Sequence, residues 1–222
     1  MRGLYAIIDV GTLAARGIDP IRFASAVLVA RPAALQLRAK ELPAREILGL
    51  LRTLGPMCKR VKVPLVTNDR ADLAVFSGCD MVHVGQDDIA VDLVRRIAPG
   101  LRLGISTHTL AQLAAALHVR PAYVAYGPVY ATTTKSNPSP TVGIAELREA
   151  NALAMARGVP LVAIGGITLD RASEIAGAAD AGAVIAALLP ETNDLVEVTA
   201  RAIALHAALL GTGGAIVVGA GA

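Results

Sequence analysis

Eight short apolar runs, separated by longer helical patterns, constrain the fold of this chain more than any other feature. The runs are near-continuous in hydrophobicity rather than alternating, which is typical of parallel strands buried on both faces. They cover Leu4–Asp9, Ala34–Arg38, Pro64–Asn68, Met81–Val84, Leu103–Ser106, Tyr123–Tyr126, Pro160–Ile164 and Ala183–Leu188.

The segments between the runs carry Ala and Leu with Arg and Glu at helical spacing. They include Ala44–Lys59, Ile89–Ile97, Leu110–Leu117, Ile144–Arg157, Leu169–Ala176 and a last helix from about Asp194 to Leu210. Eight strands alternating with helices predict an α/β fold, a single (β/α)8 TIM barrel. No linker divides residues 1–210, which we expect to form one catalytic domain. Residues 211–222 are rich in Gly and Ala and are predicted to be a flexible tail.

The composition of the chain limits the kinds of partner that it is expected to bind. The chain has 222 residues, 54% of them apolar, and a net charge of +3, an excess too small and too scattered to favour nucleic acid. No stretch reaches the roughly 18 uncharged apolar residues that a membrane-spanning helix needs. The N-terminus lacks a signal-peptide pattern, and Cys58 and Cys79 form no CxxC motif. We therefore expect a cytoplasmic protein with small-molecule partners.

Polar residues collect where the second strand ends. Gln36, Arg38 and Lys40 alternate along this end, so period two sends all three to the same side. Arg supplies a planar fork of donors and Lys a mobile point charge. Two cations and an amide in this place can hold a diphosphate; the alternative is a solvated strand end.

Two carboxylates follow the third and fourth strands. Asn68 and Asp69 end the third strand, and Asp88 lies in the loop after the fourth. Asn68 can donate to a phosphate oxygen, and one or two carboxylates with phosphate oxygens and water suit Mg²⁺. The alternative for Asn68 and Asp69 is helix capping, and Asp87 competes with Asp88 for the metal or caps the next helix.

The fourth and fifth strands end in candidate hydrogen-bonding groups. We interpret His83 as a packed or hydrogen-bonded residue, because no ligand-spaced partner follows it. Ser106 can donate to an anion, and no acid–His arrangement marks it as a nucleophile. His108 is either an acid/base group or a histidine that merely begins a helix.

The loop after the sixth strand, residues 127–138, clusters hydroxyl groups beside Lys135 and is a candidate lid over bound phosphate. After the seventh strand, Gly165 and Gly166 precede a helix. Glycines there let backbone N–H groups approach a phosphate, at the place where such barrels commonly bind one.

These pieces together resemble the thiamine-phosphate synthase family. The match runs from Leu4 to about Leu189, through the segments QLRAK, TNDRADLA, VHVGQDD, GISTH, GPVYATTTK, PTVG and AIGGIT in that order. The resemblance implies that a hydroxymethylpyrimidine diphosphate is joined to a thiazole phosphate, with release of diphosphate. It also suggests a homodimer.

The resemblance implies a role for each site residue. The pyrimidine diphosphate would be held by Gln36, Arg38, Lys40, Asn68, Ser106 and Lys135, among which Arg38, Lys40, Ser106 and Lys135 would be catalytic. Mg²⁺ would be bound by Asp69 and Asp88. The thiazole phosphate would be held by Thr132, Thr134, Gly166, Ile185 and Ala186. The family usually has Ser at the position of Ala186, so we expect weaker thiazole binding here.

Two alternatives remain open at this stage. A thiazole tautomerase on the same barrel would use His108 as its acid/base group and would not bind diphosphate. A non-catalytic sensor would bind thiamine phosphates without turnover. The complete set of diphosphate and metal residues favours the synthase over both.

Overall fold

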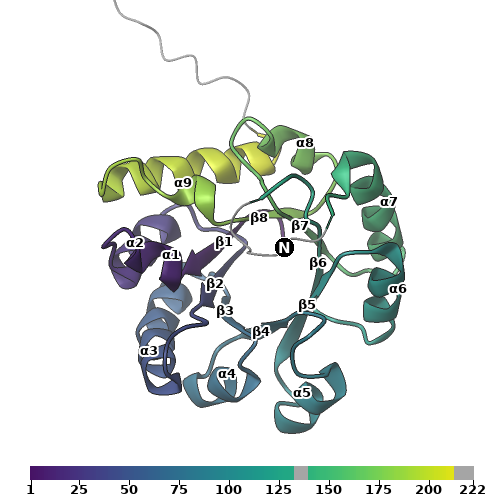
Figure 1. Ribbon diagram of the computed structural model, residues 1–222, viewed down its shortest axis with the longest axis horizontal. Helices are drawn as coiled ribbons and strands as arrows, with labels where there is room; N and C mark the ends of the chain where they lie inside the picture. Colours follow the sequence, from purple (N-terminus) through teal and green to yellow (C-terminus); the bar gives the residue numbers. More distant parts are fainter. Residues whose placement is uncertain (133–139, 213–222) are drawn as a thin grey trace, which may run out of the picture.

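The computed structural model describes residues 1–132 and 140–212. Its centre is a closed barrel in which each strand pairs in parallel with the next, and the last strand pairs with the first (Figure 1). The strands are β1 (Gly3–Asp9), β2 (Ala34–Arg38), β3 (Leu65–Asn68), β4 (Met81–Val84), β5 (Arg102–Thr107), β6 (Tyr123–Tyr126), β7 (Leu161–Ile164) and β8 (Ala181–Val184). The predicted (β/α)8 barrel is confirmed.

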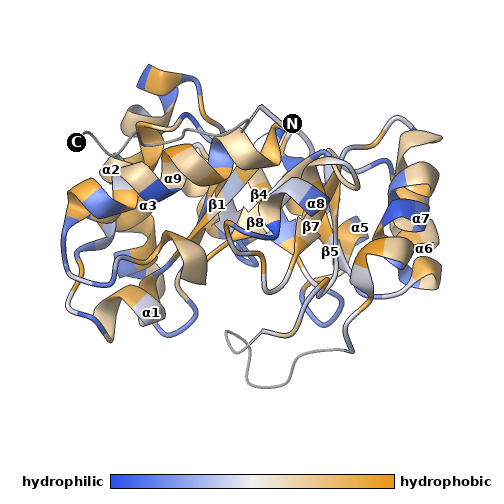
Figure 2. Ribbon diagram, turned by 90° about the horizontal axis from the view of Figure 1, so that it is seen from above, coloured by the Kyte–Doolittle hydropathy of each residue, from blue (hydrophilic) through white to orange (hydrophobic). Residues whose placement is uncertain are grey.

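Helices surround the barrel as an outer ring (Figure 1). They are α1 (Val10–Ala14), α2 (Pro20–Leu28), α3 (Ala44–Val61), α4 (Ala71–Ser77), α5 (Val91–Ile97), α6 (Leu110–His118), α7 (Gly143–Met155), α8 (Ala172–Ala176) and α9 (Leu195–Leu209), with a 3-10 helix η1 (Ala186–Leu188). Figure 2 shows the helices flanking the strands, with polar residues on outer turns such as those of α7.

The buried residues form two clusters. The larger lies between the strands and the helices, and the smaller fills the inside of the barrel. Inward residues alternate with outward ones along each strand. In β6, for example, Tyr123 and Ala125 belong to the inner cluster, whereas Val124 and Tyr126 belong to the outer one. The same alternation brings polar side chains to the inside near the carboxyl ends of β2, β4 and β5.

Strand β1 is held by the last strand and the last helix. Gly3 pairs with Ala181 of β8. The backbone N–H of Leu4 donates to Nδ1 of His206 in α9 at 3.2 Å. A side chain at Gly3 would collide with the His206 ring, and Gly3 also has a positive φ of 88°. The glycine therefore lets α9 lie close against β1.

The largest differences between the predicted and observed bounds are in the eighth strand and in helix α8. We expected a strand over Ala183–Leu188, but β8 covers Ala181–Val184 and the residues from Ala186 turn into η1. A side chain at Gly182 would overlap Leu209 of α9, so small residues are needed where the strand begins. Helix α8 begins at Ala172 rather than Leu169.

Three other expectations concern the cysteines, membrane-spanning helices and the C-terminal tail. Cys58 and Cys79 are buried free cysteines. Within the described part of the chain, no helix has both the length and the apolar character needed to cross a membrane. The predicted tail lies outside the described residues from position 213 onward.

Candidate active site

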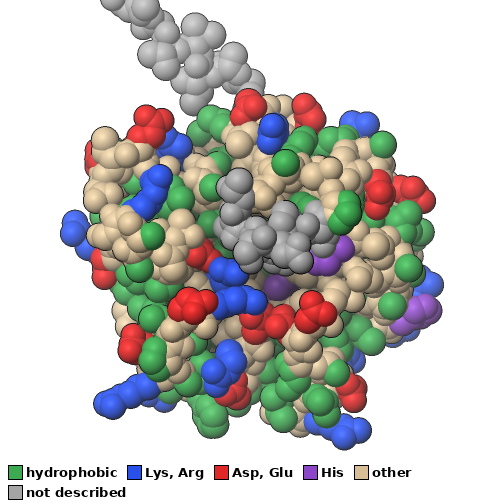
Figure 3. All heavy atoms as spheres, viewed as in Figure 1, with side chains coloured by type: hydrophobic (Ala, Val, Ile, Leu, Met, Phe, Trp, Pro, Cys, Tyr) green, Lys and Arg blue, Asp and Glu red, His purple; other side chains and the backbone are tan. Residues whose placement is uncertain are grey.

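The carboxyl ends of the strands meet at one end of the barrel, and the predicted site residues follow them. Figure 3 looks onto this end and shows acidic and basic side chains gathered near its centre. Four neighbouring strands and their loops supply Arg38 (at the end of β2), Lys40 (after β2), Asp69 (after β3), Asp88 (after β4) and Ser106 (in β5).

Arg38 is held by a carboxylate that the sequence analysis did not assign to the site. Asp9 and Arg38 are partners in the register of β1 and β2, and the Asp9 Oδ2 atom accepts a hydrogen bond from Arg38. The other oxygen of Asp9 accepts from the backbone N–H of Thr12 at 2.9 Å and from its hydroxyl at 2.7 Å. Asp9 thereby caps α1 and orients the guanidinium.

The charge of Asp9 is retained in this setting. Burial alone would raise the pKa of Asp9, but hydrogen bonds from Thr12 and the Arg38 cation outweigh burial and lower that pKa. Arg38 keeps 24% of its side chain exposed at the barrel end, whereas Asp9 keeps only 6%. The pair therefore presents a fixed guanidinium with donors still accessible to an anion.

Lys40, Asp69 and Asp88 form the second charged group. Lys40 Nζ lies 3.3 Å from Asp69 Oδ2. Burial raises the pKa of the Asp69 carboxyl, hydrogen bonding and repulsion from Asp88 raise it further, and Lys40 lowers it. The two carboxylates therefore face each other closely enough to share one positive partner.

The backbone fixes where these carboxylates stand. Asp69 has a φ of +60°, and its N–H donates to the His83 carbonyl of β4 at 2.8 Å. Asp88 accepts from the N–H of Gly85 at 2.7 Å. The capping alternatives are wrong, because α4 and α5 begin after Arg70 and Ala90 without a side-chain cap. Asp87 is exposed.

The donor set fits Mg²⁺. In residues 1–132 and 140–212, no group of three or more His, Cys, Asp or Glu side chains could hold a metal ion. Two facing carboxylates are nevertheless what Mg²⁺ uses when substrate phosphates and water supply its other ligands. Like charges held together in a partly buried place also favour a cation between them.

Ser106 is hydrogen-bonded to a histidine inside the barrel. His83 Nε2 lies 2.7 Å from Ser106 Oγ, and His83 Nδ1 lies 2.8 Å from the hydroxyl of Tyr123. The interpretation of His83 as a hydrogen-bonded residue is confirmed. Because the second nitrogen contacts a tyrosine rather than a carboxylate, the pair differs from a hydrolase triad.

The loop after β6 packs on the turn after β7. The backbone N–H of Tyr130 donates to the Gly165 carbonyl at 3.1 Å. Gly166 has a φ of +62°, and a side chain there would collide with the Ala131 carbonyl. The glycines thus bring the two loops into contact.

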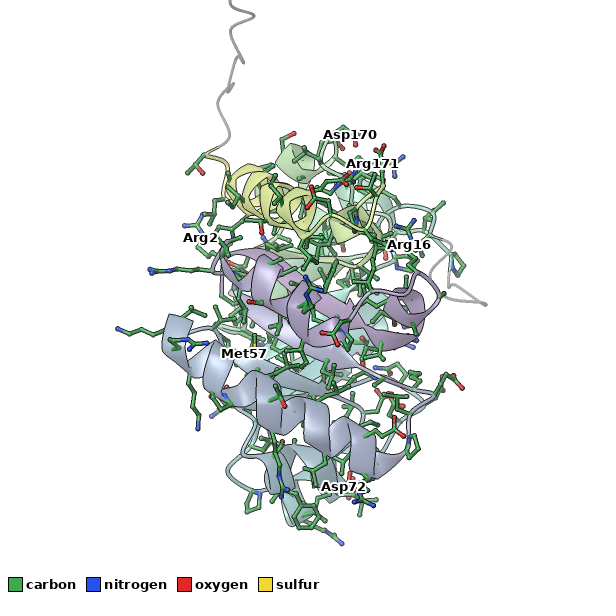
Figure 4. The ribbon with its side chains drawn as sticks, turned by 90° about the vertical axis from the view of Figure 1, so that its left-hand side faces the viewer. Arg2, Arg16, Met57, Asp72, Asp170 and Arg171 are labelled. Carbon is green, nitrogen blue, oxygen red and sulfur yellow. The ribbon has the colours of Figure 1, made fainter. Side chains whose placement is uncertain are left out.

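Arg171 fixes this turn from the outside and was not expected from the sequence. Its Nη1 donates to the Gly166 carbonyl at 3.0 Å, and its guanidinium lies 4.7 Å from the centre of the Tyr130 ring. Figure 4 shows Arg171 beside Asp170 in the loop before α8. Arg171 therefore contacts both the turn after β7, through the Gly166 carbonyl, and the loop after β6, through the Tyr130 ring.

The remaining predicted residues lie around these groups. Gln36 is buried in the barrel, and Asn68 at the end of β3 is half-buried. Thr132 is half-buried, Ile185 precedes η1, and the exposed Ala186 begins it. His108 holds the Gly127 carbonyl through Nδ1 at 2.6 Å. Thr134 and Lys135 lie outside the described residues.

Comparisons with known proteins point in one direction. The family model described as thiamine monophosphate synthase matches residues 4–188. A thiamine-phosphate synthase of Koribacter versatilis is 42% identical over 196 residues, covering 84% of this chain and 88% of the relative. That of Anaeromyxobacter dehalogenans is 38% identical over 207 residues, covering 93% and 87%. The solved thiamine phosphate pyrophosphorylase of Pyrococcus furiosus superposes with a TM-score of 0.81 at 26% identity, covering 96% and 97%.

Proposed function

The chain belongs to the thiamine monophosphate synthase family, and from this premise we propose how its barrel end performs the reaction. It is a transferase of thiamine biosynthesis, a thiamine-phosphate synthase. The synthase expectation therefore holds over the tautomerase and sensor alternatives. Its substrates are 4-amino-2-methyl-5-hydroxymethylpyrimidine diphosphate and 4-methyl-5-hydroxyethylthiazole phosphate or its carboxylated form.

The diphosphate binds to the two cations at the end of β2, Arg38 and Lys40, and to the Ser106 hydroxyl near the end of β5. Arg38 donates to it from the position that Asp9 fixes. Lys40 lies close to Asp69 and is half-exposed, so it can reach an anion placed above the carboxylates. Ser106, Asn68 and Lys135 add further donors, and Gln36 binds the pyrimidine. The arrangement places positive charge where the leaving group gains negative charge.

Asp69 and Asp88 would hold Mg²⁺ between themselves and the diphosphate. When bound, the ion supplies neutralisation of the charge that develops on the leaving diphosphate. The support for this assignment is the raised pKa of Asp69, to which the facing Asp88 carboxylate contributes. A cation between the two carboxylates relieves their repulsion.

The reaction needs no protein nucleophile. The bond between the exocyclic methylene carbon and the diphosphate oxygen breaks, and its electron pair leaves with the diphosphate. The electron-rich aminopyrimidine stabilises the resulting cation. The lone pair of the thiazole nitrogen then forms the new C–N bond, which yields thiamine phosphate; with the carboxylated thiazole, the ring carboxylate must in addition be lost as CO2. The protein orients both substrates and excludes water, which would otherwise trap the cation.

The thiazole phosphate binds at the turn after β7 and the start of η1. Gly166 in its left-handed conformation brings backbone N–H groups to the surface of the turn. Ile185 and Ala186 add the backbone of η1, and Thr132 and Thr134 add hydroxyl groups. The hydrogen bond from Tyr130 to Gly165 joins the loop that carries Thr132 to the turn that carries Gly166.

The observation that carries the proposal is the placement of Arg38, Lys40 and the two facing carboxylates on adjacent strand ends. The test measures diphosphate release and thiamine phosphate formation with both substrates, with and without EDTA. We expect equimolar products that require both substrates and Mg²⁺. Isomerisation of the thiazole alone, or binding without turnover, would refute the proposal.

Two further parts of the proposal concern the setting of the enzyme. A cytoplasmic location is supported by the two buried free thiols, because reducing compartments keep cysteines unpaired. A homodimer remains a prediction from the family resemblance, and sedimentation at several protein concentrations measures it.

A further inference from the structure

A row of hydrogen bonds crosses the inside of the barrel from β2 to β5. Gln36 Nε2 donates to the Tyr5 hydroxyl at 3.1 Å, which lies 2.7 Å from the hydroxyl of Tyr123. The Tyr123 hydroxyl lies 2.8 Å from His83 Nδ1, and His83 Nε2 lies 2.7 Å from Ser106 Oγ. The reaction described above uses the two ends of this row and assigns nothing to its middle.

The middle of the row is buried among apolar side chains. Tyr5 and Tyr123 are 2% and 0% exposed, and they share the inner cluster with Val66 and Met81. Buried hydroxyl and imidazole groups are costly unless they are hydrogen-bonded. The chain also keeps Gly104 opposite Tyr123, where a side chain would overlap the phenol ring. Apolar residues could fill this space without requiring hydrogen-bond partners or a glycine at position 104. We therefore expect the polar row to serve a function.

Each phenol in the row keeps one hydrogen to donate. Burial raises the pKa of Tyr5 and raises that of Tyr123 well above its ordinary value, so both stay protonated. The Tyr5 oxygen accepts from the Gln36 amide, which offers it no acceptor, so its hydrogen is directed to its other neighbour in the row, the Tyr123 oxygen. The hydrogen of Tyr123 is then left for His83 Nδ1, which lies 2.8 Å away, and this direction requires Nδ1 to be unprotonated. A row of single donors therefore has one direction.

The direction of the hydrogen bonds in the row determines which nitrogen of His83 is protonated and where the Ser106 hydroxyl points its hydrogen. A neutral imidazole that accepts at Nδ1 carries its hydrogen on Nε2. His83 then donates to Ser106 Oγ. Because Ser106 accepts from His83, its own hydrogen is directed elsewhere and can be given to an anion. In the opposite direction, Ser106 would give its hydrogen to His83.

We propose that Tyr123 is a positioning residue, which sets the tautomer of His83 and thereby makes the Ser106 hydroxyl a donor to the diphosphate. The second half of this proposal rests on the proposed function, since it needs diphosphate at Ser106. The first half concerns the protein alone. Tyr5 and Gln36 act through Tyr123 by fixing the direction of its hydroxyl.

The first experiment reads the tautomer without any activity. Protein labelled with ¹⁵N-histidine gives long-range ¹H–¹⁵N spectra that distinguish the protonated from the unprotonated ring nitrogen, with a His83→Gln sample to assign the signal. We expect the Nε2–H form of His83 in the wild type and a mixture of tautomers in Tyr123→Phe. The Nδ1–H form in the wild type, or an unchanged signal in Tyr123→Phe, would overturn the proposal.

The matched control is Tyr126→Phe. Tyr126 lies three residues further along β6, is fully buried and donates to Glu146 on the helix side of the strand. The Tyr126→Phe variant therefore loses one buried hydroxyl, as Tyr123→Phe does, but the lost hydroxyl is not part of the row of hydrogen bonds. We expect it to keep the wild-type His83 signal, and a tautomer change there as large as in Tyr123→Phe would show a general packing effect and overturn the proposal.

The second experiment tests the connection to substrate with a double-mutant cycle. We expect Tyr123→Phe to raise KM for the pyrimidine diphosphate about tenfold and to leave KM for the thiazole phosphate unchanged. In a Ser106→Ala background the same change should have no further effect. Additive effects would overturn the action through Ser106. An inactive wild-type enzyme would instead refute the proposed function and leave the tautomer result standing.

Discussion

Replacing Asp9 with Asn removes the counter-charge of Arg38 and leaves most of the surrounding structure unchanged. Asn is as good a helix cap as Asp, so the cap of α1 by way of Thr12 is retained. What disappears is the charge-assisted hydrogen bond from the guanidinium to Asp9 Oδ2. Asp9 is 6% exposed, so water cannot replace the lost partner on that side.

The loss of folding stability in Asp9→Asn can be estimated from the burial of the Asp9–Arg38 pair. Hydrogen bonds to charged groups contribute about 1.5–3 kcal/mol to stability. Arg38 is 24% exposed, which places the loss at about 2 kcal/mol, between a surface pair and a fully buried one. For a chain of this length, about 2 kcal/mol lowers the midpoint of thermal unfolding by about 4–8 °C. We also expect a higher KM for the pyrimidine diphosphate, because Arg38 loses its fixed orientation.

The pH dependence gives an independent check. The pKa of Asp9 is lowered in the folded protein, so the unfolded state binds the proton more readily. The stability from this group is therefore complete above the ordinary Asp pKa of about 3.9, and it is lost as the pH falls through the lowered folded pKa. The difference in midpoint between wild type and Asp9→Asn should be constant near neutral pH and shrink below about pH 4.

The control is the same substitution at a helix cap without an ion pair. Asp19 caps α2, is exposed, and accepts from the N–H of Arg22 at 2.8 Å. Differential scanning calorimetry of Asp19→Asn should show a shift of about 1 °C or less, because only a few tenths of a kcal/mol are lost. Equal shifts in the two variants, or a difference for Asp9→Asn that persists in acid, would refute this account of the Asp9–Arg38 pair.

Three more substitutions probe the two phosphate sites and the barrel interior. Asp88→Asn removes the repulsion with Asp69, so the metal-free protein should unfold at a higher temperature. The Mg²⁺ concentration that gives half the maximal rate should rise at least tenfold, and an unchanged Mg²⁺ dependence would contradict the assignment. Ala186→Ser should lower KM for the thiazole phosphate about two- to tenfold, the effect of one added hydrogen bond, and equal initial-rate KM values would exclude a contact. Gly104→Ala should destabilise the protein by about 1–3 kcal/mol in urea unfolding, because its methyl group overlaps the ring of Tyr123; wild-type stability would show that the ring can move aside.

The strands that could be predicted at their observed bounds are built from bulky apolar residues. In β4 and β6, almost every residue adds to a continuous apolar run, and both strands begin and end where the sequence indicated. Strand β8 begins with Ala181-Gly182-Ala183, which carries little hydrophobicity. Its small residues are required by the approach of α9, and that requirement comes from tertiary packing rather than from local pattern.

The partners of the site residues could not be predicted from spacing. Period two in β2 gives the side on which Arg38 lies, but the register between β1 and β2 is needed to place Asp9 beside it. An Asp at the end of a strand, three residues before a Thr, was the available signal for this cap. In the same way, His83 and Ser106 were each predicted to be polar ends of strands. Their contact depends on which inward side chains meet across the barrel.

The closure of the barrel by β8 and α9 affects how the chain must fold as it is synthesised. Strand β1 is synthesised first, whereas its hydrogen-bonding neighbour Ala181–Val184 and the helix carrying His206 are synthesised close to the end of the chain. Until then the outer edge of β1 is an open template for pairing with other chains. One edge of β1 therefore stays unpaired for most of the synthesis of the chain, and it is covered only when β8 and α9 have been made.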